Sequence, residues 1–539
     1  MKKGVKAWAG NQMVRTRGGL VKGFEDQSNT WVWKAIPFAK PPVGEMRWKA
    51  PRDPEPWSGV RAETEFSERA CQNRMLTDDV IGSEDCLYLN IWRPRSDQWD
   101  LPVYFWIHGG GNTIQMPIHK IAHGANVASQ SNMVFVSINY RLGEFGWFSH
   151  PALRTGKPGD EYDDSGNYGI LDIIKALQWV QENIEAFGGN PGNVFISGES
   201  AGGFNTMTLM ISPAAKGLFH KAMSQSGGAQ TFSVEEADAM ANTMISHLLV
   251  RDRTAANLKE AEKCCKNMSA KEIAAYLRAK PFAEFYACRK AAPFHMASFT
   301  DGAVIPKTGF SALEAGTYPN KVPIILGTNK EERKFSLFFR EAFPDDAFRN
   351  DEELYKNISI FGSDLWKASG VDGLLRKFRV NANQPNVYGY QFCWGARRTD
   401  GKNPLPEPYA TMLGACHAMD IPFFLNLIRT FGPIDMEIFT EKNKRGKEAL
   451  TRSMMTYVGQ FIRTGDPNRP GSEFTKTKWE PWSNKVGGPK CIIFDVDGDV
   501  PDIRMTTEEL MEESVRTRME ALPEPLRTKV KKSVSGNLL

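Results

Sequence analysis

The chain carries a serine between small residues, in a pattern suited to nucleophilic catalysis. Ser200 stands in the run Gly198-Glu199-Ser200-Ala201-Gly202, after an apolar stretch and before a helical pattern. A strand, a sharp turn and a helix are the setting of a nucleophile elbow, which exposes the serine hydroxyl at the head of the helix. Glycines suit the flanks, because a Cβ there would crowd the serine or the neighbouring strand. Small residues also cluster in ordinary turns, so the flanking strand and helix carry the prediction that Ser200 is the nucleophile.

The histidines late in the chain include a candidate general base, which a serine hydroxyl needs because it is unreactive at its free pKa. In a nucleophile-elbow enzyme the chain order is serine, acid, histidine. The histidines after Ser200 are His220, His247, His295 and His417. His220 follows the elbow too closely to leave room for an acid, and His247 lies in a helical pattern. We predict that His417, in a loop-like stretch, is the base; the alternative is a buried histidine with satisfied hydrogen bonds.

The acid that would orient His417 is expected in a loop after a strand between the serine and the histidine. The apolar run 322–326 predicts such a strand, and Glu331 and Glu332 follow it. Asp301 is a rival, but the Asp-Gly pair it forms more often marks a turn. Such an acid holds the imidazole in the correct tautomer and stabilises the imidazolium as it forms. Spacing alone does not choose between the two glutamates.

A glycine run early in the chain offers donors for a developing oxyanion. His108 is followed by Gly109, Gly110 and Gly111, directly after the apolar run 101–107. Backbone N–H groups at glycines can approach a substrate carbonyl without side-chain obstruction, and this arrangement is known from lipases and esterases. A flexible loop or a phosphate cradle are the alternatives, but the glycine spacings of dinucleotide and P-loop sites are absent. Two motifs of one mechanism, in the right order, favour an acyl-transfer site more strongly than either motif alone.

Composition limits the partners that this site would serve. The chain has 539 residues, of which 41% are apolar and 24% charged, which is typical of a globular protein and excludes disorder, collagen and coiled coil. Basic and acidic residues number 67 and 63, without a dense basic stripe, so no nucleic-acid partner is expected. No apolar run approaches the roughly 18 residues of a membrane span. No Cys-x-x-Cys pair and no His-Glu-x-x-His motif occurs, so no structural or catalytic zinc site is expected.

The amino terminus and the cysteines bear on the compartment. Met1-Lys2-Lys3 resembles the start of a signal peptide, but no apolar region follows it. The expected location is therefore secreted or periplasmic if a leader was removed, and cytoplasmic otherwise. Cys71 and Cys86 are 15 residues apart (86 − 71). A disulfide over that loop would stabilise by about 3 kcal/mol, but spacing alone leaves a disulfide and two free thiols equally open.

The elements that must position these residues alternate between apolar strands and amphipathic helices. This alternation predicts a mostly parallel twisted sheet flanked by helices, an α/β fold. The expected strands are 101–107, 133–138, 194–197 and 322–326, and the expected helices include 168–187, 234–249, 258–277 and 436–463. Two blocks, about 232–300 and 343–410, read as large helical insertions. The residues from Leu522 onward are expected to form a loose tail. Because distant segments must meet at one site, we expect a single domain over 1–539.

With these residues placed, the chain resembles the type-B carboxylesterases, a family of the α/β-hydrolase fold that includes para-nitrobenzyl esterases and cholinesterases. The likeness spans most of the chain. Besides the elbow and His417, it rests on the stretches Ile36–Gly44, Ser83–Trp92, Asn139–Gly143, Gly166–Gly169, Phe187–Pro191, Gln225–Gly227, Gly327–Glu332 and Thr464–Asn468. The run Ser83–Trp92 is the most specific of these. The resemblance implies a serine ester hydrolase that needs no cofactor.

The resemblance also implies roles that the spacing left open. The second acidic residue of the pair, Glu332, would be the catalytic acid. The N–H groups of Gly110, Gly111 and Ala201 would form the oxyanion hole. Cys71 and Cys86 would pair as a disulfide. Glu199 would shape the electrostatics behind the serine.

The chain also departs from the family pattern. Arg333 and Lys334 follow the acid where the family often has glycine, and we expect them to face solvent. Asn112 follows the glycine run where phenylalanine is common, which predicts a more polar pocket. No tryptophan occurs in 72–82, which argues against a cholinesterase.

The predicted function is hydrolysis of a small-molecule carboxylic ester through an acyl-enzyme, by a monomer or small homo-oligomer. One alternative is a lipase-like esterase at lipid interfaces, which would need an apolar lid. A non-catalytic binding module is the other, and a fluorophosphonate probe would separate it from an enzyme.

Overall fold

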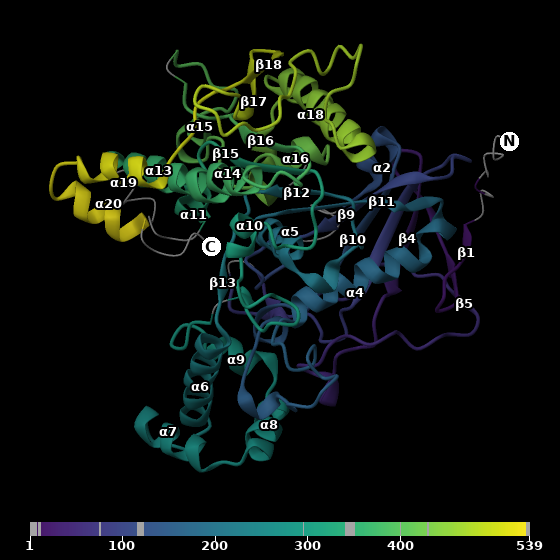
Figure 1. The fold of residues 1–539 in the computed structure, drawn as a ribbon, viewed down its shortest axis with the longest axis vertical. Helices are drawn as coiled ribbons and strands as arrows, with labels where there is room; N and C mark the ends of the chain where they lie inside the picture. The colour runs from purple at the N-terminus through teal and green to yellow at the C-terminus, as the bar shows by residue number, and fades with distance from the viewer. Residues whose placement is uncertain are drawn as a thin grey trace.

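One mixed sheet of eleven strands forms the centre of the protein, in a computed structural model that describes residues 8, 12–74, 77–115, 123–294, 296–339, 351–398, 400–427 and 431–534 (Figure 1). The strand order is β18-β17-β16-β15-β12-β11-β9-β10-β8-β4-β3. In that order the strands span Val500–Met505, Cys491–Asp497, Val387–Phe392, Ile324–Asn329, Lys221–Gln225, Gly189–Glu199, Leu101–Ile107, Val134–Ile138, Tyr88–Pro94, Thr30–Pro37 and Phe24–Asp26. The strands from β17 to β10 are parallel, and those outside them are antiparallel to their neighbours. The carboxyl ends of β9, β11 and β15 therefore lie at one edge.

The two faces of the sheet are covered by different helices, which explains why the residues of its central strands are largely buried. Along β9, Val103 and Phe105 belong to the core under α4 (Tyr168–Asn183). Tyr104 belongs to the opposite core, under α18 (Lys444–Thr464) and α2 (Ala125–Ser131). All seven residues of β9 are buried. No helix in the described ranges combines the length and apolarity needed to cross a membrane.

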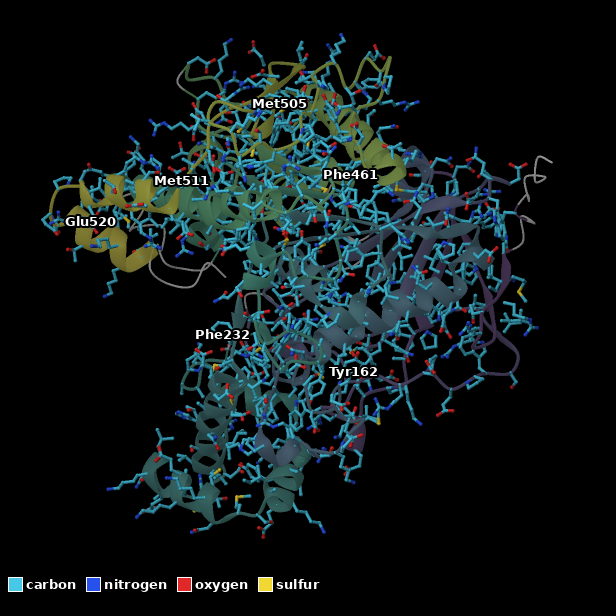
Figure 2. The ribbon with its side chains drawn as sticks, viewed as in Figure 1. Tyr162, Phe232, Phe461, Met505, Met511 and Glu520 are labelled. Carbon is cyan, nitrogen blue, oxygen red and sulfur yellow. The ribbon has the colours of Figure 1, made fainter. Side chains whose placement is uncertain are left out.

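The first predicted insertion is a group of helices that extends away from the sheet at the bottom of Figure 1. It comprises α6 (Val234–Arg251), α7 (Leu258–Asn267), α8 (Ala270–Ala279) and α9 (Phe282–Cys288). Figure 2 labels Phe232 where this group leaves the main body. The prediction of a single helix over 258–277 is wrong, because two helices occupy this range. Ser269 begins a new helix there, because its hydroxyl accepts from Glu272 N while the Glu272 carboxylate accepts from Ser269 N.

The second predicted block, 343–410, contains helices and also a central strand. Residues 340–350 lie outside the described residues. The helices α13 (Glu352–Lys367) and α14 (Gly373–Arg379) flank a π-helical turn at Ala368–Asp372. The strand β16 follows within the block, so the described helical part ends at Arg379. The block therefore completes the sheet as well as covering it.

Residues 522–534 do not form the expected loose tail, and residues 535–539 lie outside the described residues. Residues 512–520 and 526–534 are the helices α19 (Glu512–Glu520) and α20 (Leu526–Val534), at the left of Figure 1. Val530 and Val534 are buried against Ile358 of α13 in a small separate core. Prolines interrupt the segment only at its turn, and the basic residues occupy the outer face of α20.

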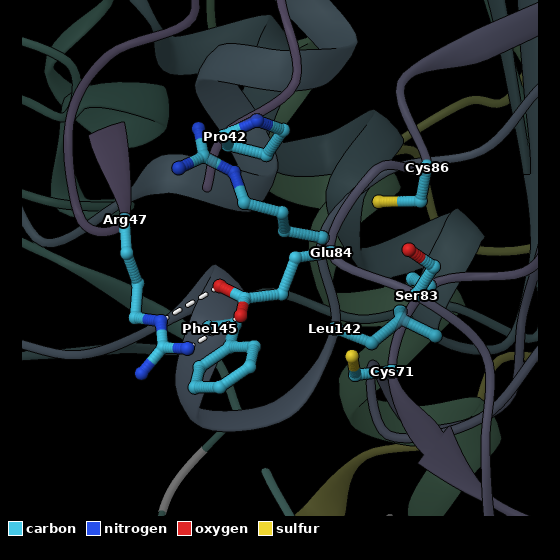
Figure 3. A pocket seen from close by; sticks show the side chains of 10 residues that line it. Pro42, Arg47, Cys71, Ser83, Glu84, Cys86, Leu142 and Phe145 are labelled. Atoms are coloured by element: carbon cyan, nitrogen blue, oxygen red, sulfur yellow. Dashed lines mark hydrogen bonds and ion pairs between the residues drawn. The ribbon is translucent and has the colours of Figure 1, made fainter. Parts of the chain in front are cut away.

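The disulfide expected between Cys71 and Cys86 is not formed; both are free thiols. Both line a small pocket beside the ion pair of Arg47 and Glu84, and Figure 3 shows the two side chains on separate segments around it. The loop is closed instead by backbone pairing, in the hairpin of β6 (Gln72–Asn73) with β7 (Val80–Ile81). Burial raises the pKa of the Cys71 thiol to about 12 and disfavours the thiolate that would start disulfide exchange.

A buried ion pair joins the chain after β10 to α4. Arg141 donates from Nε and Nη2 to the two carboxylate oxygens of Asp172, at 2.8 and 2.7 Å, and the side chains are 3% and 0% exposed. Replacing Arg141 with alanine leaves a buried, unpaired carboxylate and is expected to lower the free energy of unfolding by about 3–5 kcal/mol.

Urea unfolding measures this loss. The matched control is Arg504→Ala, which removes an exposed partner of Asp502 and should cost about 1 kcal/mol or less. Equal losses in the two variants would contradict the argument from burial.

Candidate active site

Ser200 lies at the sharp turn between β11 and α5 (Ala201–Ile211). Its backbone has φ 57° and ψ −124°, a strained conformation for a residue with a side chain. The turn is held by Ser200 N, which donates to Gln225 O of β12 at 2.9 Å. A Cβ on Gly202 would lie 2.1 Å from Ile107 O of β9, so glycine is required for the helix to start this close to the sheet. The expected strand, turn and helix around the serine are therefore confirmed.

The glycine run after β9 lies against this turn. A Cβ on Gly109 would come within 3.1 Å of the Ser200 Cβ. Gly110 and Gly111 have φ of 107° and 61°, and their N–H groups donate to no acceptor among the described residues. Two free donors beside the serine can bind an anionic oxygen. Asn112 is buried and bonded to Met296 O at 2.8 Å, so its amide holds the loop in place.

Glu332 lies in the turn after β15, buried and fully hydrogen-bonded. Its Oε2 is 2.5 Å from His417 Nδ1. Its Oε1 accepts from Ser226 Oγ at 2.5 Å, Thr328 Oγ1 at 2.7 Å and Asn329 N at 2.6 Å. These donors fix the carboxylate in one orientation, so it can in turn fix the ring of His417.

His417 lies between two carboxylates. While Nδ1 faces Glu332, Nε2 lies 3.0 Å from Glu199 Oε1. Among the described residues, no hydrogen bond joins Ser200 Oγ to Nε2. Catalytic hydrogen bonds are often looser without substrate than in the reacting complex. The four residues Glu199, Ser200, Glu332 and His417 meet at the carboxyl ends of the parallel strands and the loops that follow them.

The comparisons with known proteins agree with this geometry. A sequence model described as the carboxylesterase family matches residues 10–360 and 344–488. The chain belongs to the carboxylesterase family. It is 33% identical to the medium-chain fatty acyl-CoA hydrolase precursor of Anas platyrhynchos, over 85% of each chain. It is 31% identical to the para-nitrobenzyl esterase of Bacillus subtilis, over 85% of this chain and 91% of that one.

Solved carboxylesterase structures share the fold. The Geobacillus stearothermophilus carboxylesterase EST55 matches with a TM-score of 0.70 and 29% identity, over 92% of this chain and 98% of that one. A para-nitrobenzyl esterase structure matches with a TM-score of 0.67 and 25% identity, over 95% and 100%. The predicted α/β-hydrolase fold is confirmed, and this carboxylesterase is a carboxylic ester hydrolase.

The acidic surroundings of His417 set the protonation of the site. Burial alone would lower the pKa of His417, but the carboxylates of Glu199 and Glu332 outweigh it and raise the pKa to about 9. Burial raises the pKa of Glu199 to about 8, against the opposing pull of His417. Burial would also raise the pKa of Glu332, yet the charge of His417 and the hydrogen bonds to the carboxylate hold it below its ordinary value. Glu332 is therefore ionised at neutral pH, whereas Glu199 and His417 titrate as a coupled pair.

Glu199→Gln should move the pH profile of this carboxylesterase. If His417 is the base, it must be neutral to accept a proton, and kcat/KM then falls as the pH drops through the pKa of His417. The amide removes a charge that raises this pKa, so the acid limb of kcat/KM is expected to shift to lower pH. Hydrolysis of 4-nitrophenyl acetate across pH 5–10 measures it. The control Glu262→Gln removes an exposed carboxylate on α7. An acid limb that stays in place or moves to higher pH would contradict the expectation.

The other sequence candidates lie elsewhere or serve as supports. Asp301 accepts from the backbone N–H groups of 303–305, as expected of a turn residue. His220 accepts from Val194 N, and His295 lies outside the described residues. Glu331 points away from the ring of His417; its carboxylate accepts from Ala415 N at 3.2 Å and pairs with Lys334 at 2.9 Å. Lys334 is buried, so the expectation that it faces solvent is wrong.

Sequence reasoning missed several residues that contact the site. The Trp366 ring of α13 lies 5.0 Å from the His417 ring, and its Nε1 donates to Gly227 O at 3.3 Å. The Phe335 ring of α11 (Arg333–Phe339) lies 5.8 Å from His417. Aromatic rings therefore pack against the histidine from two helices. A third buried acid, Asp420, accepts from Tyr390 Oη at 2.6 Å and from Asn329 Nδ2 at 3.2 Å.

Proposed function

We propose that Ser200, His417 and Glu332 form the catalytic triad of this ester hydrolase and that the reaction passes through an acyl-enzyme. The observation that carries the proposal is the 2.5 Å contact between Glu332 Oε2 and His417 Nδ1, beside a serine strained into an elbow. We propose equally that residues 1–539 act as one catalytic unit. Support for this comes from the four loops of the site, which all follow strands of one sheet.

In the first half-reaction the Ser200 oxygen attacks the ester carbonyl, and His417 Nε2 takes the serine proton. The carbonyl oxygen becomes an oxyanion, to which the N–H groups of Gly110, Gly111 and Ala201 donate. His417 then protonates the leaving alcohol, and the acyl group stays on Ser200. In the second half-reaction water attacks the acyl carbonyl through the same base, which releases the acid and restores the serine. Glu332 keeps Nδ1 protonated throughout, so Nε2 is the nitrogen that accepts and donates.

For His417 to serve as the base, Nε2 must turn from Glu199 to Ser200. Protonation of Glu199 removes its negative charge and so weakens its attraction for a protonated His417 ring. Because the pKa of Glu199 is raised to about 8, this protonation occurs near neutral pH. Glu199 therefore acts as a positioning residue, through the charge state of the histidine.

A fluorophosphonate probe tests the proposal directly. The expected result is one label per chain, on the peptide that contains Ser200, with loss of ester hydrolysis in proportion to labelling. Prior reaction with a slow-releasing acyl ester should protect the serine. Labelling elsewhere, or full hydrolysis after complete labelling, would overturn the triad; no labelling would favour a binding module. The lipase alternative predicts a rise in rate above the solubility limit of the substrate.

The oxyanion donors make a separate prediction. Gly110→Ala would place a Cβ 2.0 Å from Ile114 O at a φ of 107°, which alanine does not adopt. The glycine run must shift, and losing one donor lowers kcat by about 10²–10³-fold. The matched variant Gly111→Ala meets only Thr113 Oγ1 at 3.6 Å with a φ of 61°, and should lose less. Steady-state kcat for 4-nitrophenyl acetate measures both, and a greater loss in Gly111→Ala would contradict this order.

A further inference from the structure

A second cleft lies beside the turn that carries Glu331 and Glu332. It has a volume of about 780 Å³ and is bounded by that turn, the outer face of α13, the segment after β16 and the start of α15 (Tyr409–Met412). Neither Ser200 nor His417 lines it. Its volume is within the range of ligand sites, about 300–1,000 Å³, and is larger than a single small ion requires.

The lining of this cleft is more basic than the chain as a whole. Seven lysine and arginine side chains face it against four carboxylates. Four of the cations have acidic partners, in the pairs Lys334–Glu331, Arg518–Asp364, Arg398–Asp495 and Lys402–Asp497. These pairs hold the walls and neutralise part of the charge.

The other three cations have no such partner. Lys330, Lys356 and Arg397 lie within 4 Å of no carboxylate among the described residues. They come from three elements: the turn after β15, α13 and the loop after β16. Two carboxylates of the same lining, Glu352 and Glu407, pair with no cation among the described residues, so three unpaired cations face two unpaired carboxylates. An excess of cations in a concave surface concentrates anions from solution. The cleft therefore has a net positive charge, which a bound anion would neutralise.

One side of the cleft, at Glu331, contacts the backbone segment that carries His417. Lys334 is buried and pairs with Glu331, whose carboxylate accepts from Ala415 N. Glu331 N also donates to Ala415 O at 2.9 Å, two residues before His417. An anion in the cleft would thus bind next to the backbone that carries the histidine, without entering the catalytic centre.

We propose that this cleft binds an anion bearing two or more phosphoryl groups. Three unpaired cations on separate walls match charges that are spaced along a ligand. The planar guanidinium of Arg397 can donate two parallel hydrogen bonds to a phosphoryl group, while the lysines act as point charges. This binding goes beyond ester hydrolysis and does not depend on the triad.

Isothermal titration calorimetry with inorganic tripolyphosphate, at constant ionic strength, tests the proposal on the full chain. The expected result is saturable binding at one site per chain. The variant K330E/K356E/R397E should bind at least about tenfold more weakly. The matched control K259E/K263E/K266E changes the charge equally on exposed residues of α7, far from the cleft in Figure 1, and should bind like the parent.

Four results would overturn the proposal. The first is no saturable binding, and the second is an equal loss in both triple variants. The third is loss of binding after fluorophosphonate labelling, which would put the anion in the catalytic centre. Citrate is the comparison ligand: tighter binding of citrate than of tripolyphosphate would reject the phosphoryl assignment. Because binding is measured on labelled and unlabelled protein, failure of this proposal is distinct from failure of the triad.

Discussion

Ser200→Ala is expected to lower kcat for ester hydrolysis by about 10⁶-fold, because no acyl-enzyme can form without the hydroxyl. Some catalysis should remain, since the oxyanion donors and the binding surface persist. The alanine keeps the Cβ and the backbone bond to Gln225 O, so the fold should survive. Steady-state and burst kinetics with 4-nitrophenyl acetate measure the loss, and the variant should show no burst.

A matched serine variant separates chemistry from packing. Ser197→Ala removes a buried hydroxyl three residues earlier on β11, where Oγ donates to Gln225 Oε1 at 3.3 Å. It should keep kcat within an order of magnitude of the parent. Thermal unfolding of both variants checks that each one is folded. If Ser200→Ala retained the parent rate, or if Ser197→Ala lost as much, Ser200 would not be the nucleophile.

The parts of the fold that sequence predicts are those with local signals. The apolar runs at 101–107 and 194–197 are central parallel strands, buried on both faces, so their composition alone reveals them. The edge strand β18 is partly exposed, and Pro501, Asp502 and Arg504 interrupt its apolar residues, so it has no such run. The strand β16 lies within the block that we expected to be helical, although all its residues are buried and three are aromatic. Strand pairing that depends on distant segments leaves little trace in a local window.

The residues of the site also divide into those that a contiguous motif predicts and those that only distant contacts bring together. The elbow and the glycine run are each contiguous, and glycine is required where the backbone must come close or turn sharply. The Asp420–Tyr390 contact joins residues 30 apart on different elements, and the Trp366 ring reaches His417 from another helix. Neither contact follows from spacing. The burial of Lys334 was not predicted either, because its pair with Glu331 packs against the segment around Ala415, which is distant in the sequence.

Adjacent glutamates on a tight turn cannot be told apart by spacing, yet they point to opposite sides and should differ sharply in function. Glu332→Gln keeps the shape of the side chain but removes the charge that stabilises the imidazolium. Its amide can also present N–H to Nδ1 and favour the wrong tautomer. We expect kcat to fall by about 10⁴-fold, the loss seen when the acid of a serine triad becomes an amide.

Glu331→Gln is the matched test, since it makes the same change one residue away. Its amide oxygen can still accept from Ala415 N, and the variant loses only the ion pair with Lys334. We expect kcat within an order of magnitude of the parent and a lower thermal midpoint, because Lys334 is left buried without its counter-charge. The kinetics of the two variants, measured on folded protein, assign the acid. Losses of similar size would mean that the turn as a whole, and not the carboxylate at Nδ1, supports the histidine.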